Sequence, residues 1–257
     1  MKLLDAVEPK VTNAMNQMLL RDFQEFKVKT ALKQMYPLKA PGLDGMPPLF
    51  FQHFWPLIGN VVTKIVLDFL NFGIVPPNFN ETHIVLVPKI KEPKGVTDYR
   101  LISLCNVVYK LASKAIANRL ENILPSIIND TQSAFVHGRL ITDNVLVTFE
   151  TMHHINMKKG GKKGEMALKL DMSKAYDRVE WGCLDKIMEK LGFESRWRKL
   201  LLTCISTVTY SIQINGKPNG HMVLSRGLRQ GDPLSPYLFL LCAEGLSSLI
   251  KKGVSDG

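Results

Sequence analysis

The spacing of apolar residues along the chain predicts several helices. From Val108 to Ile123 apolar residues recur three or four positions apart, the spacing that places side chains on one helix face. The same pattern predicts helices in the stretch up to about Leu38 and at residues 56–72, 145–155, 184–191 and 237–249. Gly73 and Gly192 follow two of these segments as stop signals. Another helix is predicted after Ser195, a suitable N-cap residue.

β-Branched and alternating runs predict the strands. Residues 83–89 are β-branched and bounded by proline, and residues 210–216 alternate and end in Asn-Gly, a strong hairpin signal. The return strand is expected near residues 221–225. Residues 166–171 are also expected to form a strand, with their apolar side chains on one face and Asp171 on the other. Helices and strands mix without a βαβ rhythm, so the predicted fold class is α+β.

Composition adds a bias toward an anionic partner. The 257 residues are 46% hydrophobic with a mean hydropathy of +0.01, which favours a globular core and excludes a disordered chain. Lys and Arg total 33 against 23 Asp and Glu, a formal net charge of +10. Such a charge favours nucleic acid first and an acidic membrane second, although a merely basic globular protein is an equal alternative.

Cysteine spacing and the apolar runs indicate an intracellular protein. The four cysteines lie far apart without a C-x-x-C pair, as expected of thiols in a reducing compartment. The N-terminus has acidic residues where a signal peptide needs an apolar run, and the apolar stretch at residues 237–250 is interrupted by Glu244. We expect a soluble cytoplasmic or nuclear protein that does not enter membranes.

Two segments contain candidate chemistry, each with a structural alternative. An aspartate at a strand end, as predicted for Asp171, is a common Mg²⁺ ligand, but Asp171 could instead only cap the following turn. In the second segment Gly231 would allow close backbone approach, and Asp232-Pro233 would cap a helix whose N-terminus could bind an anion. The alternative there is a well-capped core helix. The adjacent His153 and His154 point about 100° apart on a helix, so we expect surface or packing histidines.

Six runs of sequence, taken in order, resemble the reverse transcriptase domain of plant LINE-type (non-LTR) retrotransposons over nearly the whole chain. Each run alone is weakly to moderately specific, and the ordered set is strong. The runs are Lys39-Ala-Pro-Gly-Leu-Asp-Gly45, Asp98-Tyr-Arg-Leu-Ile-Ser-Leu104, Lys110-Leu-Ala-Ser-Lys-Ala-Ile-Ala-Asn-Arg-Leu120, Gln132-Ser-Ala-Phe-Val-His-Gly-Arg-Leu-Ile-Thr-Asp-Asn144, Leu170-Asp-Met-Ser-Lys-Ala-Tyr-Asp177 and Gly227-Leu-Arg-Gln-Gly-Asp-Pro-Leu-Ser-Pro236.

The resemblance implies a right-hand polymerase fold and RNA-directed DNA polymerase activity. Residues 1–130 would be an N-terminal extension and fingers, and residues 131–257 a partial palm with an antiparallel sheet packed on helices. The partners would be an RNA template, a DNA primer and dNTPs. A primer 3′-OH would attack the dNTP α-phosphate with the help of two Mg²⁺ (or Mn²⁺) ions. Nothing in the sequence indicates an oligomeric state.

The resemblance also implies roles for residues around the nucleotide. Asp171 resembles the family's first catalytic, metal-binding carboxylate. Tyr176 resembles the gate beside the incoming sugar, and Gln230 and Gly231 resemble the turn that packs on the nascent base pair. Two cations, Arg100 and Lys89, would contact the triphosphate, a role for which the guanidinium is especially suited.

Other basic residues are candidates for nucleic-acid contacts. Arg139 lies in the block that resembles the family's template-contacting loop. Lys110, Lys114 and Arg119 are expected on the polar face of the helix at residues 108–123, either solvated or on the template. Residues 158–164 form a basic turn that we expect to be solvated.

The chain departs from the family in four places. Leu43, Leu101 and His137 stand where the family usually has proline, so these loops should be looser. The Phe/Tyr-Ala-Asp-Asp block does not occur in the sequence, which ends short of where that block belongs. We therefore expect an incomplete polymerase, inactive alone, with an unpaired strand edge and an exposed apolar patch. The alternatives are a domesticated nucleic-acid-binding remnant without catalysis, and a maturase or telomerase relative that shares the palm signature.

Overall fold

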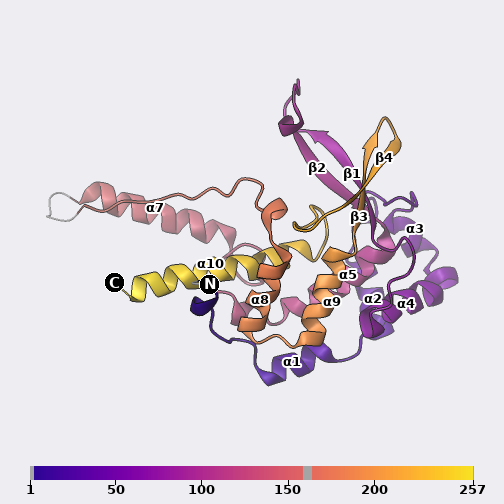
Figure 1. Cartoon of the computed structure of the whole chain (residues 1–257), viewed down its shortest axis with the longest axis horizontal. Coiled ribbons are helices and arrows are strands. Elements are labelled where there is room, and N and C mark those ends of the chain that lie inside the picture. The colour runs from indigo at the N-terminus through magenta and orange to yellow at the C-terminus, as the bar shows by residue number, and fades with distance from the viewer. Residues whose placement is uncertain (1–2, 159–163, 257) are drawn as a thin grey trace.

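A computed structural model describes residues 3–158 and 164–256. Figure 1 shows a body of packed helices from which two β-hairpins project on one side and the long helix α7 on another. The elements, in chain order, are η1 (Leu4–Ala6), α1 (Asn13–Leu20), α2 (Glu25–Lys33), α3 (Pro48–His53), α4 (Trp55–Phe72), β1 (Glu81–Pro88), η2 (Val96–Asp98), β2 (Tyr99–Cys105), α5 (Val107–Glu121), α6 (Leu124–Ile127), α7 (Ile141–Met157), η3 (Tyr176–Arg178), α8 (Trp181–Leu191), α9 (Ser195–Ser206), β3 (Thr209–Ile214), β4 (Lys217–Val223) and α10 (Ser235–Ser255).

The sheet confirms the α+β class but corrects the predicted strand arrangement. Its strand order is β2-β1-β3-β4, and β1 runs parallel to β3 while the two outer pairs are antiparallel. The sheet is therefore mixed, because β1 and β3 leave the helical body in the same direction, each after its own helix. Strands from both sides of residue 130 share this sheet, and the division into fingers and palm at that residue stays a prediction.

Helix α5 lies at the centre of the core. Tyr109, Leu111, Ile116 and Leu120 are fully buried, as are residues on its other faces. The predicted helix at residues 108–123 is confirmed, but its predicted solvated face is wrong, since even Lys110 is only 2% exposed. Helices α2, α4 and α10 pack around α5 and bury most of its surface, while Lys114, Asn118 and Arg119 are half-buried.

Most predicted helices are confirmed, with shifted starts. α4 and α8 end at Gly73 and Gly192 in the left-handed conformation, as the stop signals predicted. α9 begins at Ser195 itself, after Glu194 as N-cap. α10 begins at Ser235, so Asp232-Pro233 precede the helix instead of capping it. In the described part of the chain, no helix combines the length and apolar character needed to cross a bilayer.

The predicted hairpin is confirmed at its turn. Asn215 and Gly216 have φ values of 49° and 77°, the left-handed pair that an Asn-Gly hairpin turn requires. β4 follows directly from Lys217, four residues before the predicted return strand begins.

The strand predicted at residues 166–171 is wrong. These residues form no strand and are exposed, because no other strand within the described residues lies beside them to complete a hydrogen-bond ladder. Helix α7 likewise has no buried residues. The apolar patch expected at the edge of the palm sheet is a different surface and stays a prediction. We call residues 141–158 and 164–172 the arm. The basic turn predicted at residues 158–164 falls largely on residues 159–163, outside the described residues.

Candidate nucleotide and nucleic-acid cleft

A cleft of about 630 Å³ collects residues from distant parts of the chain. We call it the Gln230 cleft. The lining brings Tyr176, Gln230 and Gly231 together with basic residues from the N-terminal half of the chain. Its full lining is Gln34, Met35, Tyr36, Lys39, Lys110, Lys114, Tyr176, Arg229, Gln230, Gly231, Asp232, Pro233 and Pro236. Five of the residues predicted from the sequence therefore meet here.

Main-chain hydrogen bonds bring Tyr176 beside the Gln230 turn. The Leu228 N–H donates to the Tyr176 carbonyl at 2.9 Å, and the Gly227 N–H donates to the Val179 carbonyl at 2.8 Å. The Tyr176 ring stacks on Phe239 of α10, with centroids 5.2 Å apart. Partial burial raises the pKa of the Tyr176 hydroxyl. The ring therefore has a fixed orientation at the cleft wall.

The Gln230–Gly231 turn separates two hollows. The Ser103 N–H of β2 donates to the Gln230 carbonyl at 3.2 Å, which docks the turn on the sheet. Gly231 has a φ of 101°, a conformation that side chains other than glycine adopt only with strain. Beyond the turn, Gln230 also lines an apolar hollow of about 400 Å³ against Ile84, Tyr210 and Ile212.

Three lysines form the basic wall of the cleft. Lys114 is half-buried and Lys39 is exposed. The buried Lys110 ammonium donates to the Ala40 carbonyl at 2.8 Å, and burial lowers the pKa of this lysine. It therefore anchors the Lys39–Gly45 loop as well as contributing charge. Lys39 was not selected from the sequence as a site residue, although it begins the first of the six family-like runs.

Arg119 lies on the far side of α5 from the cleft. With 3.6 residues per turn, nine positions place Arg119 about 180° around the helix from Lys110. Its guanidinium stacks on Phe23 at 3.3 Å from the ring centroid and donates to the Leu19 carbonyl at 2.8 Å. Burial lowers the pKa of Arg119 to about 10. The expectation that it shares a face with the two lysines is wrong, because the helical repeat separates them.

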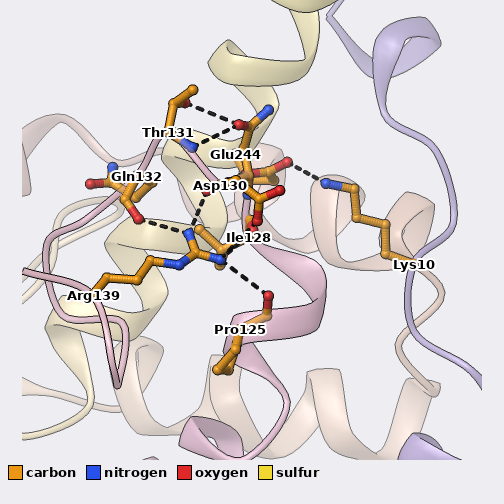
Figure 2. Close-up of polar contacts among 9 residues, drawn as sticks. Lys10, Pro125, Ile128, Asp130, Thr131, Gln132, Arg139 and Glu244 are labelled. Atoms are coloured by element: carbon orange, nitrogen blue, oxygen red, sulfur yellow. Dashed lines mark hydrogen bonds and ion pairs between the residues drawn. The ribbon is translucent and has the colours of Figure 1, made fainter. Parts of the chain in front are cut away.

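Arg139 binds main-chain carbonyl groups of the preceding loop. Figure 2 shows its guanidinium pointing into the turn formed by residues 125–132. It donates to the carbonyls of Gln132 at 2.8 Å, Pro125 at 3.1 Å and Ile128 at 3.2 Å, among others. A template contact for Arg139 stays a prediction, while its observed contacts stabilise the loop.

The remaining predicted residues lie outside the cleft lining. Asp171 is exposed on the arm. Arg100 is exposed on β2, and the Lys89 ammonium donates to the Thr97 carbonyl at 2.9 Å at the end of the β1–β2 hairpin. His153 and His154 are exposed on α7, as expected of surface histidines.

The described side chains do not form a metal site by themselves. Across residues 3–158 and 164–256, no group of three or more His, Cys, Asp or Glu side chains is arranged to hold a metal ion. Asp171 is a single exposed carboxylate, which suits a Mg²⁺ ion only if substrate phosphates supply further ligands.

Comparison with known proteins identifies the family. The family model described as "Reverse transcriptase (RNA-dependent DNA polymerase)" matches residues 88–255. The chain belongs to the reverse transcriptase family. The match begins at the end of β1 and runs through α10, so it includes every residue of the Gln230 cleft lining except Gln34, Met35, Tyr36 and Lys39. Members of this family use divalent ions such as Mg²⁺.

Three relatives refine the assignment of this reverse transcriptase domain. A "Transposon TX1 uncharacterized 149 kDa protein" of Xenopus laevis is 31% identical over 88% of the chain and 17% of the relative. A "Retrovirus-related Pol polyprotein from type-1 retrotransposable element R2" of Popillia japonica is 25% identical over 84% of the chain and 30% of that relative. An uncharacterized mitochondrial protein of Arabidopsis thaliana is 61% identical over 17% of the chain and 36% of its own length. The predicted non-LTR retrotransposon type is confirmed, and the chain spans 17 to 36% of these relatives.

Proposed function

We propose that the chain is part of an RNA-directed DNA polymerase from a plant non-LTR retrotransposon. It would copy an RNA template onto a DNA primer with dNTPs as substrates. The observation that supports this most is the Gln230 cleft, where the Tyr176 ring, the Gln230–Gly231 turn and three lysines face a common space. The similarity to the Arabidopsis thaliana protein supports the plant origin.

The chain's own residues would bind and orient the substrates. Lys39 and Lys114 would neutralise backbone or nucleotide phosphates along the basic wall. Tyr176, stacked on Phe239, would limit space beside the sugar and so favour deoxynucleotides. The backbone at Gly231 allows a base pair to approach closely. Arg100 and Lys89 lie outside this lining, so their triphosphate contact would require the β1–β2 hairpin to move toward the cleft.

Binding of a labelled RNA–DNA hybrid at several salt concentrations tests this proposal. We expect the logarithm of the affinity to fall linearly with the logarithm of salt concentration, as released counterions require. Lys114→Gln should lower that slope by about one unit and weaken binding, whereas Lys190→Gln, an exposed lysine of α8 outside the cleft lining, should leave both unchanged. Affinity that is flat from low to physiological salt would contradict nucleic-acid binding.

Primer extension tests the catalytic part separately. The sequence has one candidate metal ligand, Asp171, and no Ala-Asp-Asp run, so we expect no extension by the 257 residues alone with Mg²⁺ or Mn²⁺. Joining the Phe/Tyr-Ala-Asp-Asp hairpin of a related element should restore extension, and Asp171→Asn in that longer chain should abolish it. Extension by the 257 residues unaided would refute the first expectation. Activity that survives Asp171→Asn would refute the metal role of Asp171.

A further inference from the structure

A buried ion pair flanks the Gln230–Gly231 turn. Arg229 precedes the two turn residues and Asp232 follows them, and their side chains approach to 2.8 Å. Each side chain is only 2% exposed. All four residues border the Gln230 cleft, but the two charged side chains are almost completely buried, so Gln230 and Gly231 lie between two enclosed charged groups.

Arg229 ties its end of the turn to the sheet and to α9. Its guanidinium donates to Asn80 Oδ1 at 2.6 Å, just before β1, and to the Cys204 carbonyl at 3.1 Å in α9. The same guanidinium lies over the Tyr109 ring, 4.0 Å from its centroid. Arg229 therefore contacts three separate elements of the body.

Asp232 ties the other end of the turn to α5 and α10. Its Oδ2 accepts a hydrogen bond from the Tyr109 hydroxyl at 2.8 Å, and its Oδ1 accepts from the Leu234 N–H at 2.9 Å. Tyr109 is fully buried in the middle of the core. It contacts both charged residues, one through its ring and one through its hydroxyl.

Stability alone is a weak explanation for this arrangement. Desolvating two charges costs about as much as their attraction returns, and apolar residues of similar volume often stabilise a core equally well. Directional hydrogen bonds fix the conformation of the turn, because several donors and acceptors at fixed positions are satisfied by only one backbone conformation. Burial by itself lowers the pKa of Arg229, but Tyr109 and Asp232 outweigh it and raise the pKa, so the guanidinium stays charged.

We infer that Arg229 and Asp232 are positioning residues that act through Gln230 and Gly231. With Tyr109 they hold the turn against Ser103, so that the cleft presents a preformed surface to the nascent base pair. This inference rests on the proposed function, because it assigns the turn a role in substrate binding. The hydrogen bond from the Ser103 N–H to the Gln230 carbonyl reports on the turn independently of any substrate.

The chain offers a matched control for the loss of a buried carboxylate. Glu244 is 1% exposed, pairs with the Lys10 ammonium at 2.7 Å and accepts from the Asn129 N–H at 2.9 Å (Figure 2). Like Asp232 it is a buried carboxylate with one ion-pair partner and one main-chain N–H donor, although Lys10 is 31% exposed, and it lies outside the Gln230 cleft. Asp232→Asn and Glu244→Gln therefore remove equivalent charges at two places.

The experiment compares Asp232→Asn, Tyr109→Phe and Glu244→Gln in the whole chain. Three quantities are measured: thermal stability, affinity for a fluorescein-labelled RNA–DNA hybrid, and amide exchange of Ser103. We expect Asp232→Asn to weaken hybrid binding by roughly tenfold and Glu244→Gln by less than about twofold, at similar losses of stability. Ser103 exchange should accelerate in Asp232→Asn and in Tyr109→Phe while amides of the β3–β4 hairpin keep their rates. Tyr109→Phe removes only the hydroxyl that donates to Asp232, and it replaces Asp232→Asn as the test variant if Asp232→Asn does not fold.

The outcomes separate this inference from the proposed function. Equal losses of hybrid affinity in the Asp232 and Glu244 variants, or unchanged Ser103 exchange, would mean that the ion pair is merely structural. If the unsubstituted chain does not bind the hybrid, the proposed function fails. Ser103 exchange then decides alone whether Asp232 and Tyr109 hold the turn.

Discussion

The Gln230 turn and the arm each contain residues of one predicted active site, yet the turn is anchored in the body of the molecule and the arm is exposed. The turn is enclosed by charged side chains that are 2% exposed. On the arm, the apolar residues Val145, Leu146 and Phe149 of α7 are 62 to 67% exposed. The exposure of α7 shows that apolar spacing specifies a helix locally, whereas burial requires a second surface on which the helix can pack. The described residues supply such a surface to the turn but not to the arm.

The residues predicted to contact the nucleotide and the predicted metal ligand also differ in how firmly the fold holds them. Tyr176 and Gln230 are connected by main-chain hydrogen bonds through Leu228, so their relative position is defined by the body. Asp171 lies five residues before Tyr176, on the exposed stretch of the arm without strand pairing. The surface that would bind the nucleotide is thus already formed, and the position of the predicted metal ligand is not constrained by packing.

The largest expected effect is a difference between two leucine substitutions. Leu120 of α5 is fully buried, and Leu146 of α7 is 62% exposed. Leu120→Ala should lower the free energy of unfolding by about 2–5 kcal/mol because it leaves a cavity. Leu146→Ala should change it by less than about 0.5 kcal/mol. Denaturant unfolding followed by circular dichroism measures both, and a comparable loss at Leu146 would mean that α7 is packed in solution.

A medium effect is expected at Arg139, where the body meets the arm. Arg139→Gln should lower the free energy of unfolding by about 2 kcal/mol, because several loop carbonyls lose a charged donor. Arg226→Gln, which removes an exposed ion pair with Glu180, is the control and should cost less than about 1 kcal/mol. Unchanged stability with weaker hybrid binding would instead favour the template role predicted for Arg139.

The smallest effect concerns two exposed carboxyl groups, Asp98 in the connection between β1 and β2 and Glu165 on the arm. Hydrogen bonds from the Gly95 and Lys94 N–H groups lower the pKa of Asp98, and the Lys158 side chain lowers that of Glu165 on the arm. Since both folded-state pKa values are depressed, each contribution to stability is present above the unfolded-state pKa and is lost as the pH falls through the folded one. High salt should return the pKa of Glu165 toward its ordinary value and leave that of Asp98 low. Carboxyl NMR titrations at two salt concentrations measure this, and equal salt sensitivity would contradict the distinction.

Local signals in the sequence predicted much of the fold. The Asn215-Gly216 turn and the glycines after α4 and α8 were identifiable because backbone conformation at these positions depends on the residue itself. The helix at residues 108–123 was predicted by periodicity. The strand at residues 166–171 was predicted wrongly, since the same alternation occurs in a stretch that finds no partner strand.

The sequence by itself determined the family and the class of fold and proposed Tyr176, Gln230 and Gly231 as site residues, because motifs and short-range backbone preferences depend on neighbouring residues. Tertiary structure decided that Lys110 is buried, that Arg119 faces away from the cleft, and that Arg229 and Asp232 form an ion pair. Burial and charge pairing depend on groups up to 234 positions apart, as between Lys10 and Glu244. Such distances in sequence carry no local signal, and packing alone brings these groups together.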